Sequence, residues 1–176
     1  MMISTLTRGL EVLTVSDYPK RKNIRIPEYD YSKPGAYFVT VCTANRVPML
    51  WRRLFLDVSD LHVPLSAAGK IVEQAIEQIP IHHANVTVDR YCIMPDHIHL
   101  LLTIHTDEEG QEIPTKALSK IVGSMKRWAS KQIGGTPWQK SFYEHGIRNH
   151  QDFVETWEYI ENNPLKYALS KQRGYG

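Results

Sequence analysis

The segment YCIMPDHIHLLLTIH, residues 91–105, decides the fold because it holds the turn of an expected β-hairpin. Aliphatic and β-branched residues, which are typical of strands, lie on both sides of the turn-forming pair Pro95-Asp96. The first strand is expected over 85–94 and the second over 97–105. Because the connection between them is short, we expect the two strands to pair antiparallel.

Two histidines lie at the start of the second strand, and the alternation of side chains decides where they point. His97 and His99 share one face of the strand, whereas Ile98 and Leu100 face the opposite way and suit a core. Residues i and i+2 of a strand stand about 7 Å apart at Cα, close enough for both rings to bind one ion. The alternative is a pair of solvated or hydrogen-bonded histidines on an open sheet face. Several divalent metals accept imidazole, so the spacing alone does not identify an ion.

Further elements follow from hydrophobic periodicity and from turn-forming residues. Strands are expected over 36–43 and within 138–147, and helices over 66–80, 114–135 and 151–169. Ser66 is the expected N-cap of the first helix and Pro80 its end, whereas Pro164 is expected to stop or kink the last helix. The order strand, helix, strand, strand, helix, strand, helix predicts an α+β fold. Its core is a ferredoxin-like βαββαβ antiparallel sheet, to which a C-terminal helix is added.

The length and composition suit one soluble domain. We place this domain at 35–170, between an irregular basic arm over 1–34 and a tail over 171–176. Hydrophobic residues make up 42% and charged residues 23% of the chain, as in ordinary globular proteins. The sequence has no apolar run that could span a membrane and no secretory signal pattern, so we expect a cytoplasmic protein with no membrane partner. Cys42 and Cys92 are the only cysteines, which argues against a disulfide scaffold or a thiolate zinc site.

Basic residues are concentrated in two segments, although the net charge of +2 by itself decides nothing about partners. No acidic residue lies between Ile113 and Tyr143, a segment that holds Lys116, Lys120, Lys126, Arg127, Lys131 and Lys140. The N-terminal arm adds Lys20, Arg21, Lys22 and Arg25. Such clusters either contact nucleic-acid phosphates or form a solvated surface. Trp138 and Tyr143 are candidates for base stacking, whereas Trp128 falls on the apolar stripe of its helix and suits the core.

The segment TWEYIENNP, residues 156–164, places Tyr159 and Asn163 on one face of the last helix. A tyrosine hydroxyl, with an ordinary pKa of about 10, becomes a nucleophile only beside a base or a metal. Three motifs in order, GAYFVTVCTANR from residue 35, YCIMPDHIHLLL from 91 and WEYIENNPLKYAL from 157, resemble the single-tyrosine HUH transposases. The REP-associated tyrosine transposases are the most similar branch. The resemblance covers residues 22–169.

The resemblance implies a mechanism and a set of site residues. His97 and His99 would bind a divalent metal, Mg²⁺ or Mn²⁺, with Asn163 as third ligand where some relatives carry glutamine. Tyr159 would be the nucleophile, and Tyr143 is the rival candidate. The implied partner is a single-stranded DNA hairpin at a REP-like palindrome, cleaved and rejoined through a 5′-phosphotyrosine by a monomer or a homodimer. No nucleotide cofactor is implied, and the sequence has no GxxxxGK[ST] phosphate-binding loop.

Two other classes of function are compatible with the residues alone. A non-catalytic single-stranded nucleic-acid-binding module would use the same order of strands and helices, as RNA-recognition domains do. A metal-dependent hydrolase would activate water instead of a tyrosine, with Asp96 or His105 as its base. A protein that keeps the transposase fold but has lost mobility is a further alternative.

Overall fold

The computed structural model describes residues 34–53, 62–106 and 117–172. Almost all of the predicted N-terminal arm lies outside these residues, including Lys20, Arg21, Lys22 and Arg25, and so does Lys116. Among the described helices, none combines the length and the hydropathy that a membrane span requires.

Within the described residues, the strands form an antiparallel sheet in the order β2-β3-β1-β4. The strands are β1 (Gly35–Cys42), β2 (Val86–Ile93), β3 (His97–Ile104) and β4 (Tyr143–Gly146). The expected hairpin is confirmed, since β2 and β3 pair directly on either side of Pro95-Asp96. This order of strands, with helices in the crossovers, confirms the predicted ferredoxin-like α+β fold.

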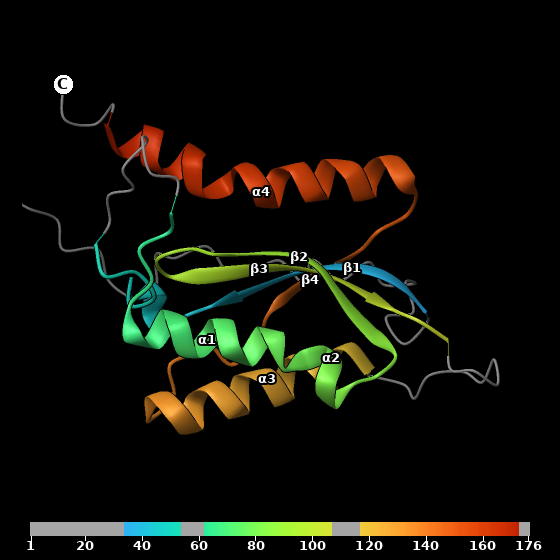
Figure 1. Ribbon diagram of the computed structural model, residues 1–176, viewed down its shortest axis with the longest axis horizontal. Coiled ribbons are helices and arrows are strands. Elements are labelled where there is room, and N and C mark those ends of the chain that lie inside the picture. The colour runs from blue at the N-terminus through green and yellow to red at the C-terminus, as the bar shows by residue number, and fades with distance from the viewer. Residues whose placement is uncertain (1–33, 54–61, 107–116, 173–176) are drawn as a thin grey trace, which may run out of the picture.

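Helices α1 (Ala67–Glu77) and α3 (Ala117–Ile133) cover one face of the sheet (Figure 1). The strand residues that face them, such as Val39 and Ile98, are fully buried. The predicted apolar stripe of α3 is confirmed over Leu118, Ile121, Val122 and Met125, which are all buried. The helix ends before Gly134 and Gly135, whose φ angles of 86° and 82° are in the left-handed region.

The last helix, α4 (His150–Gln172), lies on the opposite face of the sheet, so the protein has three layers (Figure 1). This is the face that carries the histidine pair, and α4 buries much of it. Leu101 of β3 and Ile160 of α4 are both fully buried. His99 is only 5% exposed, so it is not a solvated residue on an open face, whereas the hydrogen-bonded part of that alternative fits its contact with Thr40 at 2.8 Å.

The prediction for Pro80 needs correction, and of the two outcomes expected at Pro164 the structure excludes the stop. The first helix ends at Glu77, and Pro80 lies instead in the first turn of a short helix, α2 (Ile79–His82), where its missing N–H has no helical partner to lose. Pro164 does not stop the last helix, which continues through it to Gln172. Packing beyond the proline explains this, because Ala168 is buried and the ring of Tyr167 lies edge-on to Trp51 at 5.5 Å.

The first turn of α1 approaches the backbone of Leu50 closely. The Ser66 hydroxyl accepts a hydrogen bond from the N–H of Gly69 at 3.0 Å, which confirms the predicted N-cap. The N–H of Ser66 donates to the carbonyl of Leu50 at 2.9 Å. A Cβ atom on the buried Gly69 would collide with that same carbonyl group, so this position requires glycine.

We expect Gly69→Ala to lower the free energy of unfolding by about 1–3 kcal/mol, because the added methyl group must displace a backbone carbonyl. Gly123→Ala on α3 is the matched control. The nearest atom to its added Cβ is the flexible end of Arg127 at 3.2 Å, and alanine favours a helix over glycine by about 1 kcal/mol. Urea denaturation measures both changes. A Gly69→Ala protein as stable as wild type would contradict this close packing.

Candidate active site

His97 and His99 turn their Nε2 atoms toward each other at the start of β3. The two Nε2 atoms are 3.1 Å apart, and the ring centroids are 4.7 Å apart at an interplanar angle of 77°. Two nitrogen ligands at about 2.1 Å from one ion and at right angles to each other lie about 3 Å apart, so this spacing fits a shared metal ion. Two nitrogen lone pairs at such a distance repel unless a proton or a cation lies between them.

The other ring nitrogen of each histidine is held by a neighbouring residue. The Asp96 carboxylate accepts a hydrogen bond from Nδ1 of His97 at 2.6 Å, and Nδ1 of His99 lies 2.8 Å from the Thr40 hydroxyl. The register of β1 and β3 places Thr40 directly opposite His99. A proton on each Nδ1 leaves a lone pair on each Nε2, which is the usual arrangement of histidines that bind a metal.

Arg46 supports Asp96 from the short 3-10 helix η2 (Ala44–Arg46). Its Nε lies 3.0 Å from Asp96 Oδ2, and its Nη1 donates to Cys42 Sγ at 3.0 Å. Burial alone would raise the pKa of Asp96, but the hydrogen bond and charge of His97 and the charge of Arg46 outweigh it and lower that pKa. Asp96 therefore stays ionised and keeps His97 oriented.

Burial also determines the charge state of His99. Desolvation, followed by the positive charges of His97 and Arg46, lowers the pKa of His99 to about 3. The imidazole of His99 is therefore neutral near pH 7, and the neutral form is the one that binds a metal.

Tyr159 of α4 lies beside the histidine pair. The centroid of its ring is 5.4 Å from that of His99 and 5.9 Å from that of Phe38. The residue is 46% exposed, so a substrate can reach it from solvent. The ring centroid of Tyr143, on β4, lies 6.2 Å from that of Phe38 instead. The contact with His99 favours Tyr159 over Tyr143 as the residue that works with the histidines.

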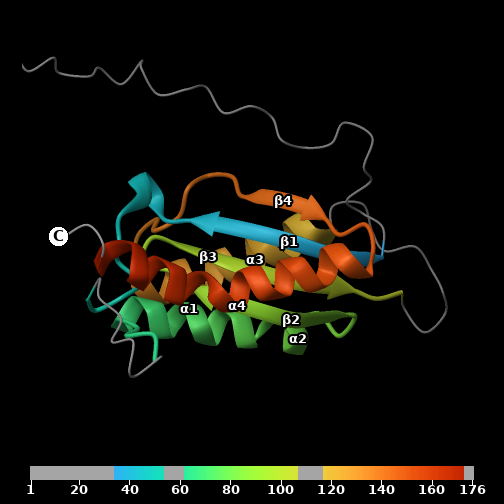
Figure 2. The same ribbon diagram turned by 90° about the horizontal axis from the view of Figure 1, so that it is seen from above.

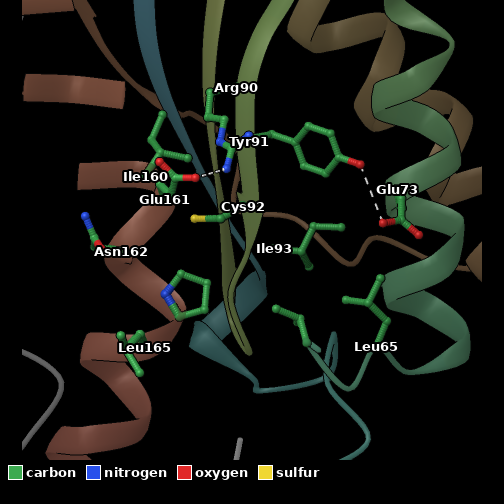
Figure 3. A pocket seen from close by; sticks show the side chains of 12 residues that line it. Leu65, Glu73, Arg90, Tyr91, Cys92, Ile93, Ile160, Glu161, Asn162 and Leu165 are labelled. Atoms are coloured by element: carbon green, nitrogen blue, oxygen red, sulfur yellow. Dashed lines mark hydrogen bonds and ion pairs between the residues drawn. The ribbon is translucent and has the colours of Figure 1, made fainter. Parts of the chain in front are cut away.

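The other flank of α4 is attached to β2. Arg90 and Glu161 form an ion pair at 2.5 Å, and the Arg90 guanidinium lies 5.3 Å from the centre of the Trp157 ring. Figure 3 shows this pair at the edge of a cavity of about 330 Å³ between α4 and β2, which Cys92 and Leu165 also line. Glu161 and Tyr159 lie on opposite flanks of the helix, so this attachment orients Tyr159 toward the histidine pair.

Asn163 follows Tyr159 by one helical turn and lies on the same flank as Tyr167. Burial, followed by the negative charge of Asp96, raises the pKa of Tyr167, which indicates that this flank runs past the Asp96 side of the site. Within residues 34–53, 62–106 and 117–172, no group of three His, Cys, Asp or Glu side chains could hold a metal. A third protein ligand would therefore need another residue type, such as the amide oxygen of Asn163, which the resemblance implies and which is half-buried one helical turn after Tyr159.

Comparisons with known proteins find relatives over most of the chain. No protein-family model matches the chain. An uncharacterised protein of Haemophilus influenzae is 31% identical over 164 residues, which cover 82% of this chain and 88% of that protein. The REP-associated tyrosine transposase of Escherichia coli is 25% identical over 142 residues, which cover 81% of this chain and 73% of that protein.

The chain belongs to the REP-associated tyrosine transposase family. A solved structure of a REP-associated tyrosine transposase bound to a REP hairpin agrees in fold, with a TM-score of 0.58 at 24% identity. That match covers 77% of this chain and 69% of the solved chain. Membership of the family makes the protein a DNA-processing enzyme.

In this family member, the basic residues of the second cluster lie in a different layer from Tyr159. Lys120, Lys126, Arg127 and Lys131 are on α3, and Lys140 follows it, on the far side of the sheet from α4 (Figure 1). Lys126, Arg127 and Lys140 line a cavity of about 500 Å³. The structure brings these residues together with one another but not with the histidine pair.

Three sequence predictions about side chains have clear outcomes. Trp138 is wrong as a base-stacking candidate, since it is 8% exposed and donates its indole N–H to the carbonyl of Lys126 at 3.2 Å. Trp128 packs against the core, as predicted, although only partly buried. His105 lies beyond the far end of β3, where its Nε2 is 2.8 Å from the Thr87 hydroxyl, so it does not join the site.

Phe38, Thr40 and Arg46 belong to the site but were missed from the sequence. Phe38 and Thr40 alternate with the core residues Val39 and Val41, and this alternation places them on the opposite face of β1. The alternation could therefore have shown that they lie on the second face. It could not have shown that this face meets the histidines, because that depends on strand register.

The lowered pKa of His99 predicts how stability varies with pH. The pKa is about 3 in the folded protein and 6.5 in the unfolded chain, so below pH 6.5 the unfolded chain gains a proton that the folded protein does not. This contribution to stability is complete above pH 6.5 and is lost as the pH falls toward 3. The loss is at most about 1.4 kcal/mol per pH unit.

Between pH 6 and pH 4, the free energy of unfolding of His99→Gln is expected to fall less steeply with decreasing pH than that of wild type. The two slopes should differ by up to about 1.4 kcal/mol per pH unit. Urea unfolding at several pH values, with a chelator present to exclude bound metal, measures this slope. His105→Gln, just beyond the exposed end of the same strand, is the matched control. Equal slopes for wild type and His99→Gln would show that His99 titrates normally in the folded protein.

Proposed function

We propose that the protein is a metal-dependent single-stranded DNA transposase and endonuclease that cleaves and rejoins DNA through a 5′-phosphotyrosine on Tyr159. One observation carries the proposal. Tyr159 lies against His99, whose Nε2 faces the Nε2 of His97 at 3.1 Å. The proposed substrate is a hairpin at a REP-like palindrome, because a related transposase has been solved with a REP hairpin bound.

His97 and His99 would hold the divalent metal, with Asn163 as a further ligand. A bound Mg²⁺ or Mn²⁺ supplies Lewis-acid polarisation of a phosphate oxygen. Imidazole nitrogen is a softer donor than the oxygen ligands that Mg²⁺ prefers, so we expect Mn²⁺ to act at lower concentration than Mg²⁺. The Asp96 carboxylate favours a proton on Nδ1 of His97, and the Thr40 hydroxyl can accept one from Nδ1 of His99, which would give both histidines the tautomer that this role requires.

In the proposed reaction the Tyr159 hydroxyl oxygen attacks the scissile phosphorus. A bond forms between that oxygen and phosphorus while the bond between phosphorus and the 3′ oxygen breaks. The tyrosine proton leaves to a base, and the departing 3′ oxygen takes up a proton. Attack by a 3′-hydroxyl on the phosphotyrosine reverses these steps and reseals a strand. Because the covalent bond preserves the reactivity of the phosphodiester, no nucleotide cofactor is needed.

A single chain would carry the two histidines and the tyrosine that this reaction uses. His97, His99 and Tyr159 of one molecule meet, so a monomer suffices for the proposed cleavage, and a homodimer would hold two such sites. Water activation by Asp96, the hydrolase alternative, is disfavoured by its lowered pKa and by its contacts with His97 and Arg46. These contacts make Asp96 a weak base.

The basic residues of α3 would contact phosphates of the same DNA. Lys120, Arg127 and Lys131 are exposed, and they lie across the sheet from Tyr159. A DNA that reaches both regions must therefore pass around an edge of the sheet. Contacts at α3 would position the DNA without acting in the chemistry.

Tyr159→Phe is expected to abolish the covalent protein-DNA adduct, because phenylalanine has no attacking oxygen. Tyr143→Phe is the matched control and is expected to keep the adduct. Purified protein is incubated with labelled single-stranded hairpin DNA, taken from the sequence that flanks its gene, in the presence of Mn²⁺ or Mg²⁺. Denaturing gels report the adduct.

The same gels separate the alternatives. A chelator, or His97→Ala, should remove the adduct if the histidines hold a required metal. An adduct lost only in Tyr143→Phe would identify Tyr143, on β4, as the nucleophile. Cleaved DNA without an adduct in wild type would favour the hydrolase, and tight binding without cleavage would favour the non-catalytic module.

Replacing Arg127 and Lys131 together by alanine is expected to weaken binding of the hairpin DNA and to flatten its salt dependence. Each lost phosphate contact should reduce the slope of log K against log salt by about 0.7–0.9. Lys70→Ala, an exposed lysine on the neighbouring helix α1, is the matched control. Binding titrations at several salt concentrations measure the slope. An unchanged slope would identify the α3 surface as merely solvated.

A further inference from the structure

The half of the sheet face beside α4 carries aromatic side chains. Helix α4 lies mainly over β2 and β3, and its N-terminal turns pass over the start of β1, so that on this side β4 and the rest of β1 are less covered (Figure 2). The strand register pairs Thr40 with Tyr143 and Phe38 with His145. Since Thr40 is also paired with His99, all of these side chains are on the face that carries the histidine pair. We call Phe38, Tyr143 and His145 the aromatic platform.

The aromatic platform is continuous with the candidate active site through Phe38. The Phe38 ring is stacked on His99, with centroids 5.2 Å apart and an interplanar angle of 27°. The centroid of the Phe38 ring lies 5.9 Å from that of Tyr159 and 6.2 Å from that of Tyr143, and both pairs are in edge-to-face geometry. Phe38 and Tyr143 are both partly exposed. At the outer end of the platform, Nε2 of His145 lies 3.3 Å from the Asp152 carboxylate of α4, which fixes the ring.

We propose that the aromatic platform binds the unpaired bases next to the scissile phosphate by stacking, and that Phe38 and Tyr143 thereby set the position of the cleavage point. The proposal rests on the proposed function of the Tyr159 site. A base is joined to its phosphate through one sugar. The bases that flank a phosphate held between Tyr159 and His99 must therefore lie within one nucleotide of this pair, where Phe38 and Tyr143 offer partly exposed rings.

The chemistry of the platform suits bases better than other ligands. Every base has a π-face that can stack on an aromatic ring, and stacking tolerates differences in sequence. Four-stranded sheets of this topology bind single strands in this way in RNA-recognition domains, with aromatic residues on the exposed face. Arg46 lies at the far end of β1, where its half-exposed guanidinium can meet a phosphate of the same strand.

The test uses Tyr159→Phe protein, which keeps the ring but cannot form an adduct, and the labelled hairpin with a single-stranded extension on either side. Bases of each extension are removed one at a time by abasic substitution, and fluorescence anisotropy gives the affinity. Removal of one or two bases next to the cleavage point should weaken binding about 5- to 150-fold, the range for one stacked base. The same substitutions should have no effect in protein that also carries Tyr143→Leu or Phe38→Leu.

Tyr143→Phe and Tyr91→Leu are the controls. Tyr143→Phe keeps the ring and should keep the abasic effect, whereas Tyr91→Leu removes a half-buried strand tyrosine from the other face of the sheet and should also keep it. If Phe38→Leu does not fold, the comparison of Tyr143→Leu with Tyr143→Phe decides.

The outcomes separate this inference from the proposed function. Abasic effects that persist in Tyr143→Leu and Phe38→Leu overturn the platform, even if wild type forms the adduct. Equal binding of intact and abasic extensions by the parent protein overturns it as well. If wild type forms no adduct but the abasic effects appear and depend on both rings, the platform stands and the proposed chemistry fails.

Discussion

Burial of β3 on both faces is the constraint on which the rest of the structure depends. On one side its aliphatic residues pack under α1 and α3, and on the other Leu101 is fully buried on the face that α4 covers. A strand in this position can hold a histidine only if its polar atoms find partners, because an unpaired buried polar group costs about 1–3 kcal/mol. His99 meets this condition through Thr40. The burial that stabilises the fold also keeps His99 neutral, and the helix that completes the burial brings Tyr159 to it.

The two flanks of α4 have different tasks. The flank toward β2 carries Glu161, which pairs with Arg90 and lines an apolar cavity. The flank toward β1 carries Tyr159, which lies beside His99, and Asn163 one turn later, and both are open to solvent in part. One flank attaches the helix and the other presents polar groups. A single helix can do both because residues two positions apart point in widely different directions.

Most of the fold could be predicted because its signals are local. Pro95-Asp96 marked the hairpin, Ser66 marked a helix start, and the apolar periodicity separated helices from strands. Local signals could not give strand register, which joins Thr40 to His99 across 59 residues. For the same reason Trp138 was assigned to the surface, although the segment after α3 folds back and buries it. The motifs predicted that His97, His99 and Tyr159 should meet, and the fold explains how they do.

In the proposed site both histidines and the tyrosine come from one chain, so completion of the site would be an intramolecular equilibrium between docked and undocked α4. The competent fraction of molecules is then independent of protein concentration, and any loss of docking weakens apparent substrate affinity in the same proportion. The exposed pair of Arg90 and Glu161 contributes at most about 1 kcal/mol to docking. The buried contact of Ile160 with the sheet supplies the larger part. Dilution would therefore leave a site of this kind intact, and a few copies in a cell would be as complete as a concentrated sample.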